Sequence, residues 1–387
     1  MKVISILGST GSIGRSTLAV VDLHPDRFKI FALSGFNNND LLLEQAIKFS
    51  PSFIVTKDLV SKKQLVDKLK EKNLDTEVLY GKDGYSFIAS HEEVTTVVAA
   101  ITGSAGLIST IDAAMSGKQI LLANKESMVM AGELINKICS ENNSALIPID
   151  SEHNAIFQVL LKNADVKEVK KIILTASGGP FRDHSLQNLK KVTVEEALNH
   201  PNWKMGKKIS IDSATMMNKG LEVIEASHLF RLNMKKIEVI MHPQSIIHSF
   251  VEFIDGSSLS QLGEPDMRVP IAYALGYPNR ITSGVDGVSL DKLTSLEFFK
   301  PDLEKFRCLD LSYQCLEEGT AHCISLNASN EVAVEAFLLG RISFIQIPEL
   351  IEKTLSKIVA SQVDSVDHII ETDNLARIET NKILSKM

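Results

Sequence analysis

The sequence predicts an α/β protein whose N-terminal part is a doubly wound, Rossmann-like parallel sheet. Three observations predict this class: a glycine-rich turn follows the first apolar segment, short apolar segments alternate with helical ones up to residue 149, and polar residues follow where apolar segments end. An α/β catalytic domain and a C-terminal helical bundle are expected to follow. The predicted parts are 1–149, 150–276, a linker at 277–310, and 311–387.

The composition and net charge limit the kinds of molecule that the protein is expected to bind. The 387 residues carry a formal net charge of −7, which argues against a general nucleic-acid binder but leaves room for a local basic pocket. No apolar run is long enough to span a bilayer, and Met1 leads directly into the first strand. We therefore expect no membrane partner, no signal peptide and a cytoplasmic location. The cysteines are too few and too irregularly spaced for a disulfide framework or a zinc site: Cys139, Cys308, Cys315 and Cys323.

The turn at residues 8–14 has the sequence GSTGSIG and lies between a predicted strand at 3–7 and a helical run at 17–21. Glycines let the backbone approach a pyrophosphate closely, and the N-terminus of the following helix faces the negative charge. The spacing is G-x-x-G-x-x-G rather than the commoner G-x-G-x-x-G, and the alternative is an ordinary tight turn. Its place after the first strand favours nucleotide binding.

The second predicted strand, 28–34, ends in Gly35, Phe36 and three asparagines. An NAD-dependent enzyme usually carries an Asp or Glu here to bind the ribose hydroxyls. This turn has neutral amides instead, and Asp40 comes too late in the chain, so no carboxylate repels a 2′-phosphate. NADP is therefore favoured over NAD.

Lys125 follows a later strand, between Asn124 and Glu126. It is either a surface turn residue or a ligand, and its place on the same sheet edge as the glycine turn favours the ligand. The segment 101–106 also follows a strand and could line the same crevice. The strands that alternate with helices in this part, and so indicate parallel crossovers, are predicted at 52–55, 78–80, 95–101 and 119–123.

An acidic turn follows the apolar segment 145–147 and opens a helix. Asp150 and Glu152 are two residues apart, so in extended backbone they point to the same side. Two like charges held so close are unfavourable unless a proton or a cation lies between them. The alternative is that both carboxylates cap the following helix.

Two segments of the second half suit a phosphorylated ligand. After a predicted strand at 171–176, Ser177 and its neighbouring glycines form either an anion-binding nest or an ordinary loop. The segment 200–206, HPNWKMG, predicts a mobile flap that carries Trp203, although a lone tryptophan is more commonly a core residue.

The segment 211–222 resembles a helix but is unusually polar. Its Ser213, Asn218 and Lys219 suit a phosphate ester. Glu222 is a third carboxylate, which with Asp150 and Glu152 could complete an oxygen-rich Mg²⁺ or Mn²⁺ site.

Two more strands are predicted at 236–241 and 246–254, with a short helix at 266–274. His242 and His248 lie near the ends of these strands. Histidines in such places are more commonly hydrogen-bonded structural residues than metal ligands, and we interpret them so.

Five motifs, in order and spacing, closely resemble the 1-deoxy-D-xylulose 5-phosphate reductoisomerase family, and the resemblance covers the whole chain. The resemblance implies NADPH- and metal-dependent rearrangement of a ketose phosphate and its reduction to 2-C-methyl-D-erythritol 4-phosphate, in the non-mevalonate isoprenoid pathway. It also implies a homodimer. The motifs lie at 8–14, 123–127, 148–153, 200–206 and 212–222.

The family's site residues transfer to matching positions of this chain. Phe36 departs from the pattern, because a basic residue is common there in the family. For NADPH the resemblance implies Thr10, Gly11, Ser12, Ile13, Gly35, Asn37, Asn124, Glu126 and Gly206. For the divalent metal, Mn²⁺ or Mg²⁺, it implies Asp150, Glu152 and Glu222. For the substrate phosphate it implies Ser177, Ser213, Asn218 and Lys219, and for the sugar Lys125, Ser151, Glu152, His200 and Glu222. The expected catalytic residues are Lys125, Asp150, Glu152, Glu222 and His200, with Trp203 and Met205 on the flap.

Two other functions fit parts of the sequence. A simple NADP-dependent dehydrogenase would use the same N-terminal half but would not need three carboxylates together with a phosphate-binding set. An NADPH-binding regulatory protein would leave the segment 200–206 unexplained. Chelation of metal separates these hypotheses, because it should abolish turnover in a reductoisomerase and leave cofactor binding in both alternatives unchanged.

Overall fold

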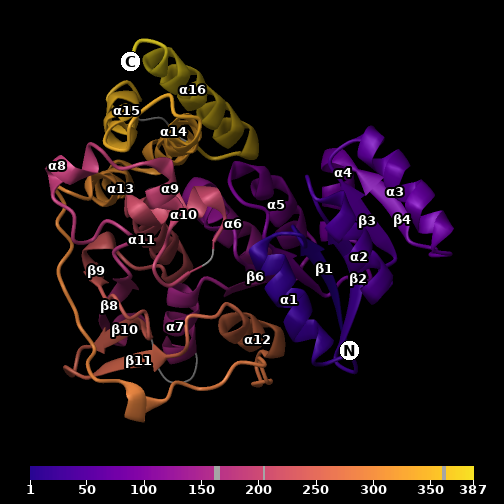
Figure 1. Cartoon of the computed structure of the whole chain (residues 1–387). Helices are drawn as coiled ribbons and strands as arrows, with labels where there is room; N and C mark the ends of the chain where they lie inside the picture. Colours follow the sequence, from indigo (N-terminus) through magenta and orange to yellow (C-terminus); the bar gives the residue numbers. More distant parts are fainter. Residues whose placement is uncertain (161–165, 204, 360–362) are drawn as a thin grey trace. The chain divides into compact units, whose positions relative to one another are not determined.

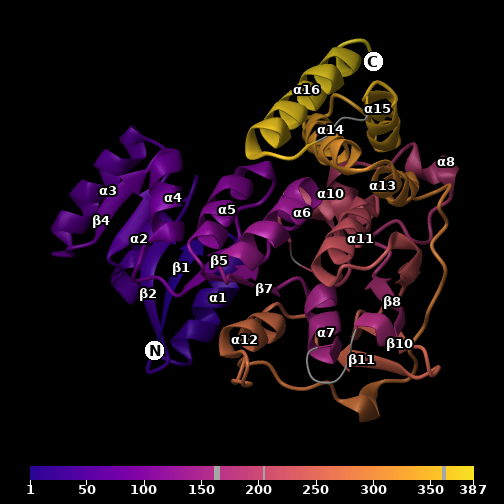
Figure 2. The same cartoon turned by 180° about the vertical axis from the view of Figure 1, so that it is seen from behind.

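The computed structural model forms two compact units, which are described separately (Figures 1 and 2). It describes residues 1–160, 166–203, 205–359 and 363–387. The first unit comprises Met1–Ser127, Ile135–Asn154 and Asp266–Asp286, and the second comprises Met128–Leu134, Ala155–Pro265 and Gly287–Met387. The four-part division made from the sequence stays a prediction.

The first unit is built on a seven-stranded sheet in the order β4-β3-β2-β1-β5-β6-β7. All of its paired strands are parallel, which confirms the predicted doubly wound arrangement. The strand order reverses at β1, which pairs with β2 on one side and β5 on the other. Ligands of such sheets bind beyond the carboxyl ends of the strands at this switch point. The strands are β1 Lys2–Leu7, β2 Phe28–Ser34, β3 Phe53–Thr56, β4 Glu77–Tyr80, β5 Thr96–Ala99, β6 Gln119–Leu122 and β7 Ala145–Pro148.

One helix from late in the chain belongs to the first unit. Lys2 Nζ donates to the carbonyl oxygens of Leu275 at 2.8 Å and Tyr277 at 3.1 Å, which ties α12 to the start of β1. The helices between and after the strands are α1 Ser12–Asp22, α2 Asn39–Phe49, α3 Leu59–Glu71, α4 Gly81–Ser90, α5 Leu107–Met115, α6 Lys125–Glu141, α7 Ser151–Leu160 and α12 Arg268–Gly276, with a 3₁₀ turn η1 at Ser104–Gly106. α6 begins and ends in the first unit, with Met128–Leu134 counted in the second, whereas α7 begins in the first unit and continues into the second.

The second unit contains a four-stranded mixed sheet in the order β11-β10-β8-β9. β8 and β9 are parallel, whereas β10 is antiparallel to both β8 and β11. Three of the four strands were predicted; β11 was not, because its sequence SLSQL is half polar and lies at an exposed edge. The strands are β8 Val169–Ala176, β9 Ile237–Met241, β10 Ile247–Phe253 and β11 Ser258–Leu262.

Helices make up most of the rest of the second unit. The predicted C-terminal bundle is confirmed, since α14, α15 and α16 pack on one another (Figure 1). Outside this bundle, the segment 277–310 has little regular structure. The helices are α8 Leu186–Leu189, α9 Val194–Leu198, α10 Lys207–Ala214, α11 Met217–Phe230, α13 Arg307–Glu318, α14 Thr320–Leu338, α15 Gln346–Leu355 and α16 Val366–Leu384, with 3₁₀ turns η2 Val166–Glu168, η3 Met234–Lys236 and η4 Leu290–Lys292.

α11 lies between the two apolar cores of the second unit. Leu221 and Ile224 belong to the core shared with α13 and α14, whereas Val223 and Phe230 belong to the core beneath β8 and β9. A helix buried on both sides is expected to be apolar all round. The charged residues that α11 nevertheless buries, described below, therefore point to a function.

Candidate active site

The glycine turn after β1 is packed closely against its own backbone. A Cβ atom on Gly14 would lie 2.4 Å from Ser9 Cα, so only glycine fits there, and Gly8 has a φ of +87° that favours glycine. Gly11 stands at the N-terminus of α1, and no side chain caps this helix among the described residues. The backbone N–H groups of its first turn are therefore available to an anion, and the prediction that this anion is a pyrophosphate stays a prediction.

The turn after β2 lies beside the glycine turn. Ser9 N donates to Ser34 O at 2.7 Å, and a Cβ atom on Gly35 would lie 3.1 Å from Thr10 Cγ2. Asn37 is exposed, as the prediction of a cofactor contact requires. The predicted cofactor residues at 10–13, Gly35 and Asn37 thus lie together at the carboxyl ends of β1 and β2.

Asn124 connects two strand ends of the same sheet. Its Nδ2 donates to Ile101 O at 2.6 Å and to Gly103 O at 3.0 Å, while its Oδ1 accepts from Ser127 N at 2.9 Å as the N-cap of α6. Nδ2 also lies 3.1 Å from Glu126 Oε2. Both side chains are buried and engaged by protein groups. Asn124 therefore holds the segment 101–106 in place, and its backbone is the part that can contact a cofactor.

Lys125 and Asp150 form a close ion pair within the first unit. Lys125 Nζ lies 2.5 Å from Asp150 Oδ2, and the side chains are only 11% and 13% exposed. Burial raises the pKa of Asp150, but the attraction of Lys125 and hydrogen bonding from His153 outweigh it and hold the pKa well below its usual range. Asp150 is therefore an anion at neutral pH. Lys125 is buried and not a surface turn residue, and its contact with a substrate stays a prediction.

The backbone of the acidic turn is helical rather than extended. Asn154 N donates to Asp150 O at 2.8 Å, so α7 begins at Ser151 and Glu152 lies in its first turn. The expectation that Asp150 and Glu152 point to one side of an extended segment is therefore wrong. Ser151 Oγ instead donates to Glu152 Oε2 at 2.7 Å, and this orients the second carboxylate.

The polar segment 211–222 is two helices rather than one. Met216 has a left-handed backbone conformation with a φ of 59°, which ends α10 and starts α11. Lys219 Nζ forms an ion pair with Glu222 Oε2, and Asn218 Nδ2 donates to Glu222 Oε1 at 2.5 Å. The Lys219 and Glu222 side chains are 5% and 1% exposed. The structure thus brings three of the predicted site residues together in the first turns of α11.

Ser213 lies at the end of α10. Two other segments contact α10 here, the loop after β8 and helix α14. A Cβ atom on Gly179 would lie 2.8 Å from Ser213 O, so the loop after β8 packs directly on this helix end. The preceding residue, Asp212, is buried and pairs with Lys208 Nζ at 2.8 Å and Asn330 Nδ2 at 2.8 Å. Sequence reasoning missed Asp212 and Asn330, because no local pattern links residues of α10 and α14.

His200 and Ser177, also predicted site residues, are hydrogen-bonded to each other. His200 Nδ1 accepts the backbone N–H groups of Asn202 at 3.2 Å and Trp203 at 3.0 Å, so we infer that the ring proton is on Nε2. Nε2 then donates to Ser177 Oγ at 2.9 Å, and burial lowers the pKa of His200 to about 4. Because Ser177 Oγ also accepts from Gly179 N at 3.1 Å, both of its acceptor positions are used and its own proton remains for a further acceptor.

The segment 200–203 is anchored to the turn between β9 and β10. Asn202 Nδ2 donates to Pro243 O at 2.6 Å and to Ser245 Oγ at 2.9 Å. The Trp203 ring is half-buried, with its centroid 6.5 Å from that of His248. Residue 204 lies outside the described residues, and Met205 and Gly206 immediately precede α10, with Gly206 as its N-cap. That this segment moves as a flap stays a prediction.

His242 is a structural residue, as predicted. Its Nδ1 lies 2.9 Å from Glu297 O, and its Nε2 accepts from Ile246 N at 3.2 Å. Both ring nitrogens are therefore used by the backbone.

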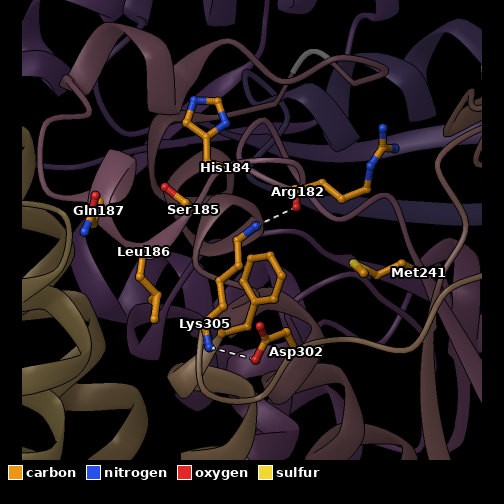
Figure 3. Close-up of a pocket in the computed structure, with 9 residues that line it drawn as sticks. Arg182, His184, Ser185, Leu186, Gln187, Met241, Asp302 and Lys305 are labelled. Carbon is orange, nitrogen blue, oxygen red and sulfur yellow. Dashed lines mark hydrogen bonds between the residues drawn. The ribbon is translucent and has the colours of Figure 1, made fainter.

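A cavity of 570 Å³ in the second unit contains none of the predicted site residues. Lys305 crosses it and donates from Nζ to Arg182 O at 2.5 Å (Figure 3). Its charged lining residues are of both signs, Arg182 and Lys305 against Asp302. The lining residues are Arg182, His184, Ser185, Leu186, Gln187, Met241, Asp302, Lys305 and Phe306.

Comparison with known families covers nearly the whole chain. Residues 4–132 match the family described as 1-deoxy-D-xylulose 5-phosphate reductoisomerase, residues 146–230 match its C-terminal domain, and residues 262–379 match the DXP reductoisomerase C-terminal domain. The chain belongs to this family. It is an oxidoreductase that isomerises and reduces 1-deoxy-D-xylulose 5-phosphate, which confirms the resemblance stated from the motifs.

Individual reductoisomerases are similar along their full length. The protein of Nitrosomonas eutropha is 51% identical over 98% of this chain and 93% of its own, and that of Trichlorobacter lovleyi is 50% identical over 100% and 98%. A DOX-P reductoisomerase crystallised with NADPH, fosmidomycin and magnesium is 47% identical, with a TM-score of 0.94 over 100% of this chain and 98% of that one. The Zymomonas mobilis enzyme in complex with NADPH is 41% identical, with a TM-score of 0.93 over 100% of both chains.

Proposed function

We propose that the chain converts 1-deoxy-D-xylulose 5-phosphate to 2-C-methyl-D-erythritol 4-phosphate with NADPH and a divalent cation, in the non-mevalonate isoprenoid pathway. The observation that carries this proposal is the full-length likeness to a reductoisomerase crystallised with NADPH, fosmidomycin and magnesium. The local geometry of each unit supports it independently, as the following paragraphs set out.

NADPH is the hydride donor, and the chain supplies its binding surface. The glycine turn binds the pyrophosphate at the N-terminus of α1, where no side chain caps the first backbone N–H groups among the described residues. Asn124 keeps the segment 101–106 against the same edge. The residues proposed to contact NADPH are Thr10, Gly11, Ser12, Ile13, Gly35, Asn37, Asn124, Glu126 and Gly206.

The divalent cation, Mg²⁺ or Mn²⁺, is bound by Asp150, Glu152 and Glu222. Its role is to polarise the substrate carbonyl. The donor set fits such an ion, because carboxylate oxygens are the ligands that hard cations prefer. Each carboxylate has a polar partner that orients it within its own unit: Lys125 for Asp150, Ser151 for Glu152, and Asn218 with Lys219 for Glu222.

The substrate phosphate is bound by Ser177, Ser213, Asn218 and Lys219. Ser177 suits this role because its hydroxyl accepts from His200 and Gly179 and can donate only outward. Lys219 supplies the buried positive charge that a phosphate dianion needs. The sugar is contacted by Lys125, Ser151, Glu152, His200 and Glu222.

The segment with Trp203 and Met205 closes over the bound substrate. Closure serves this reaction, since rearrangement intermediates would otherwise be lost to water. The hydrogen bonds of Asn202 supply a fixed anchor next to the moving part.

The enzyme is a cytoplasmic homodimer. β11 is an edge strand with exposed Leu259 and Leu262, and a second chain is the simplest means of covering such an edge. In the described part of the chain no helix has the length and apolar character required to cross a membrane.

Product analysis tests the proposed reaction most fully. The chain is incubated with 1-deoxy-D-xylulose 5-phosphate, NADPH and Mn²⁺, and the carbon skeleton of the product is determined by ¹³C NMR. We expect a branched polyol phosphate, formed in a one-to-one ratio with oxidised NADPH, and no product from Glu222→Gln. An unbranched reduced product would instead identify a simple dehydrogenase.

Sedimentation of the wild type and of Leu259→Lys tests the proposed dimer. A monomeric wild type would contradict the proposal that the enzyme is a homodimer.

A further inference from the structure

The turn after β2 has no positive charge to pair with the 2′-phosphate of NADPH. NADPH carries a 2′-phosphate, which Rossmann-type sites bind with a basic residue near the end of the second strand. Phe36 stands there with 61% of its surface exposed, and residues 35–39 contain no cation. Asp40, the nearest acidic residue, is paired with Lys68 Nζ at 2.7 Å. The counter-charge for the 2′-phosphate must therefore come from another segment.

The neighbouring strand ends beside this turn. β2 and β3 pair in parallel with Ser34 opposite Val55, and Gly35 N donates to Val55 O at 2.9 Å. Thr56 Oγ1 donates to Asn39 Oδ1 at 2.9 Å, so the end of β3 stays against the turn. Lys57 is the first residue after β3 and Phe36 the second after β2, so both follow neighbouring strand ends at the same edge of the sheet.

Lys57 is available for a ligand. It is exposed, and its Nζ lies 3.9 Å from the nearest carboxylate oxygen, Asp58 Oδ2. Asp58 is itself engaged, because its Oδ1 accepts from Ser61 N at 2.8 Å as the N-cap of α3. Lys62 on α3 is engaged by an aromatic ring, because its Nζ lies over the Tyr80 ring, 5.6 Å from the ring centroid.

We propose that Lys57 binds the 2′-phosphate of NADPH and sets the preference of this chain for NADPH over NADH. The cation is supplied by the end of β3 instead of by position 36, where the family commonly has it. The inference rests on NADPH as the cofactor of the proposed reaction. A lysine ammonium and a phosphate dianion form a charge-assisted hydrogen bond that NADH cannot offer.

Binding of two cofactor fragments to the full chain tests Lys57 directly. Adenosine 2′,5′-bisphosphate and adenosine 5′-monophosphate differ only in the 2′-phosphate, and neither supports turnover. By calorimetry we expect Lys57→Ala to weaken the bisphosphate about tenfold, equivalent to about 1.4 kcal/mol, and to leave the monophosphate unchanged. The matched control is Lys63→Ala, an exposed lysine of α3, the helix that follows Lys57, which should change neither Kd. Phe36→Lys added to Lys57→Ala should restore bisphosphate binding.

The outcomes separate this inference from the proposed reaction. An unchanged ratio of the two Kd values in Lys57→Ala overturns the role of Lys57, as does a wild-type chain that binds both fragments equally. Neither outcome bears on whether the substrate is rearranged, which the product analysis decides. A parallel loss of both fragments would show a general disturbance of the site and would also overturn the inference.

Discussion

Asn330→Leu tests how the C-terminal helices support the proposed phosphate site. Asn330 Nδ2 donates at 2.8 Å to Asp212 Oδ1, and Asp212 is 1% exposed. The substitution removes this donor and keeps the number and branching of the side-chain heavy atoms. Asp212 keeps Lys208, 2.8 Å from Oδ2, as its remaining charged partner.

The expected cost follows from the burial of the carboxylate. A hydrogen bond to a charged group contributes about 1.5–3 kcal/mol, and a buried charge that loses one of its partners cannot regain it from water. Breaking a buried pair completely would cost about 3–5 kcal/mol, but the ion pair with Lys208 persists. We therefore expect Asn330→Leu to lower the free energy of unfolding by about 2 kcal/mol.

Urea unfolding followed by tryptophan fluorescence measures this loss. Trp203 is the only tryptophan of the sequence and belongs to the second unit, so its signal reports the unit that contains Asp212 and Asn330. The control is Asn381→Leu on α16, where the exposed amide donates to the carbonyl oxygen of Arg377, and we expect a change within about 0.5 kcal/mol. Equal effects of the two substitutions would refute the reasoning.

Two further predictions concern the cofactor turn and His200. Gly14→Ala places a Cβ atom 2.4 Å from Ser9 Cα, so NADPH binding by fluorescence titration should weaken by more than about tenfold, whereas Gly287→Ala, where a Cβ meets nothing within 4 Å, should bind normally. Burial lowers the pKa of His200 to about 4 in the folded chain, against about 6.5 in the unfolded chain. Between pH 6.5 and pH 4 the unfolded chain therefore binds more protons than the folded chain, and the free energy of unfolding falls as the pH falls through this range. His200→Gln should therefore lose less stability than wild type between pH 7 and pH 5 in urea unfolding, and an equal loss would argue against a neutral buried His200.

The parallel sheet could be predicted because its signals are local. Each buried strand is a short apolar run, and the residues that follow it lie at the carboxyl edge whatever the exact pairing. The glycine turn and the acidic turn at Asp150 were found in this way. β11 was missed because an exposed edge strand needs few apolar residues.

The finer geometry of the site depends on contacts that no sequence window contains. The break at Met216 depends on a single left-handed residue, and Met is not a type that predicts one. Asp212 and Asn330 are 118 positions apart. Lys57 became a candidate only when the register of β2 and β3 was known. The sequence predicted a helix after the acidic turn but not that Glu152 already lies in its first turn, because a strand end and a helix start allow the same residues.

Consumption of NADPH with 1-deoxy-D-xylulose 5-phosphate tests the central claim most directly. The loss of NADPH absorbance is followed for wild type and Asp150→Asn, after chelation and again after Mn²⁺ is added back. We expect consumption by wild type that stops on chelation and returns with Mn²⁺, and none by Asp150→Asn, although this variant still binds NADPH. Consumption that continues without metal, or that Asp150→Asn retains, would contradict a reductoisomerase that works through its carboxylates.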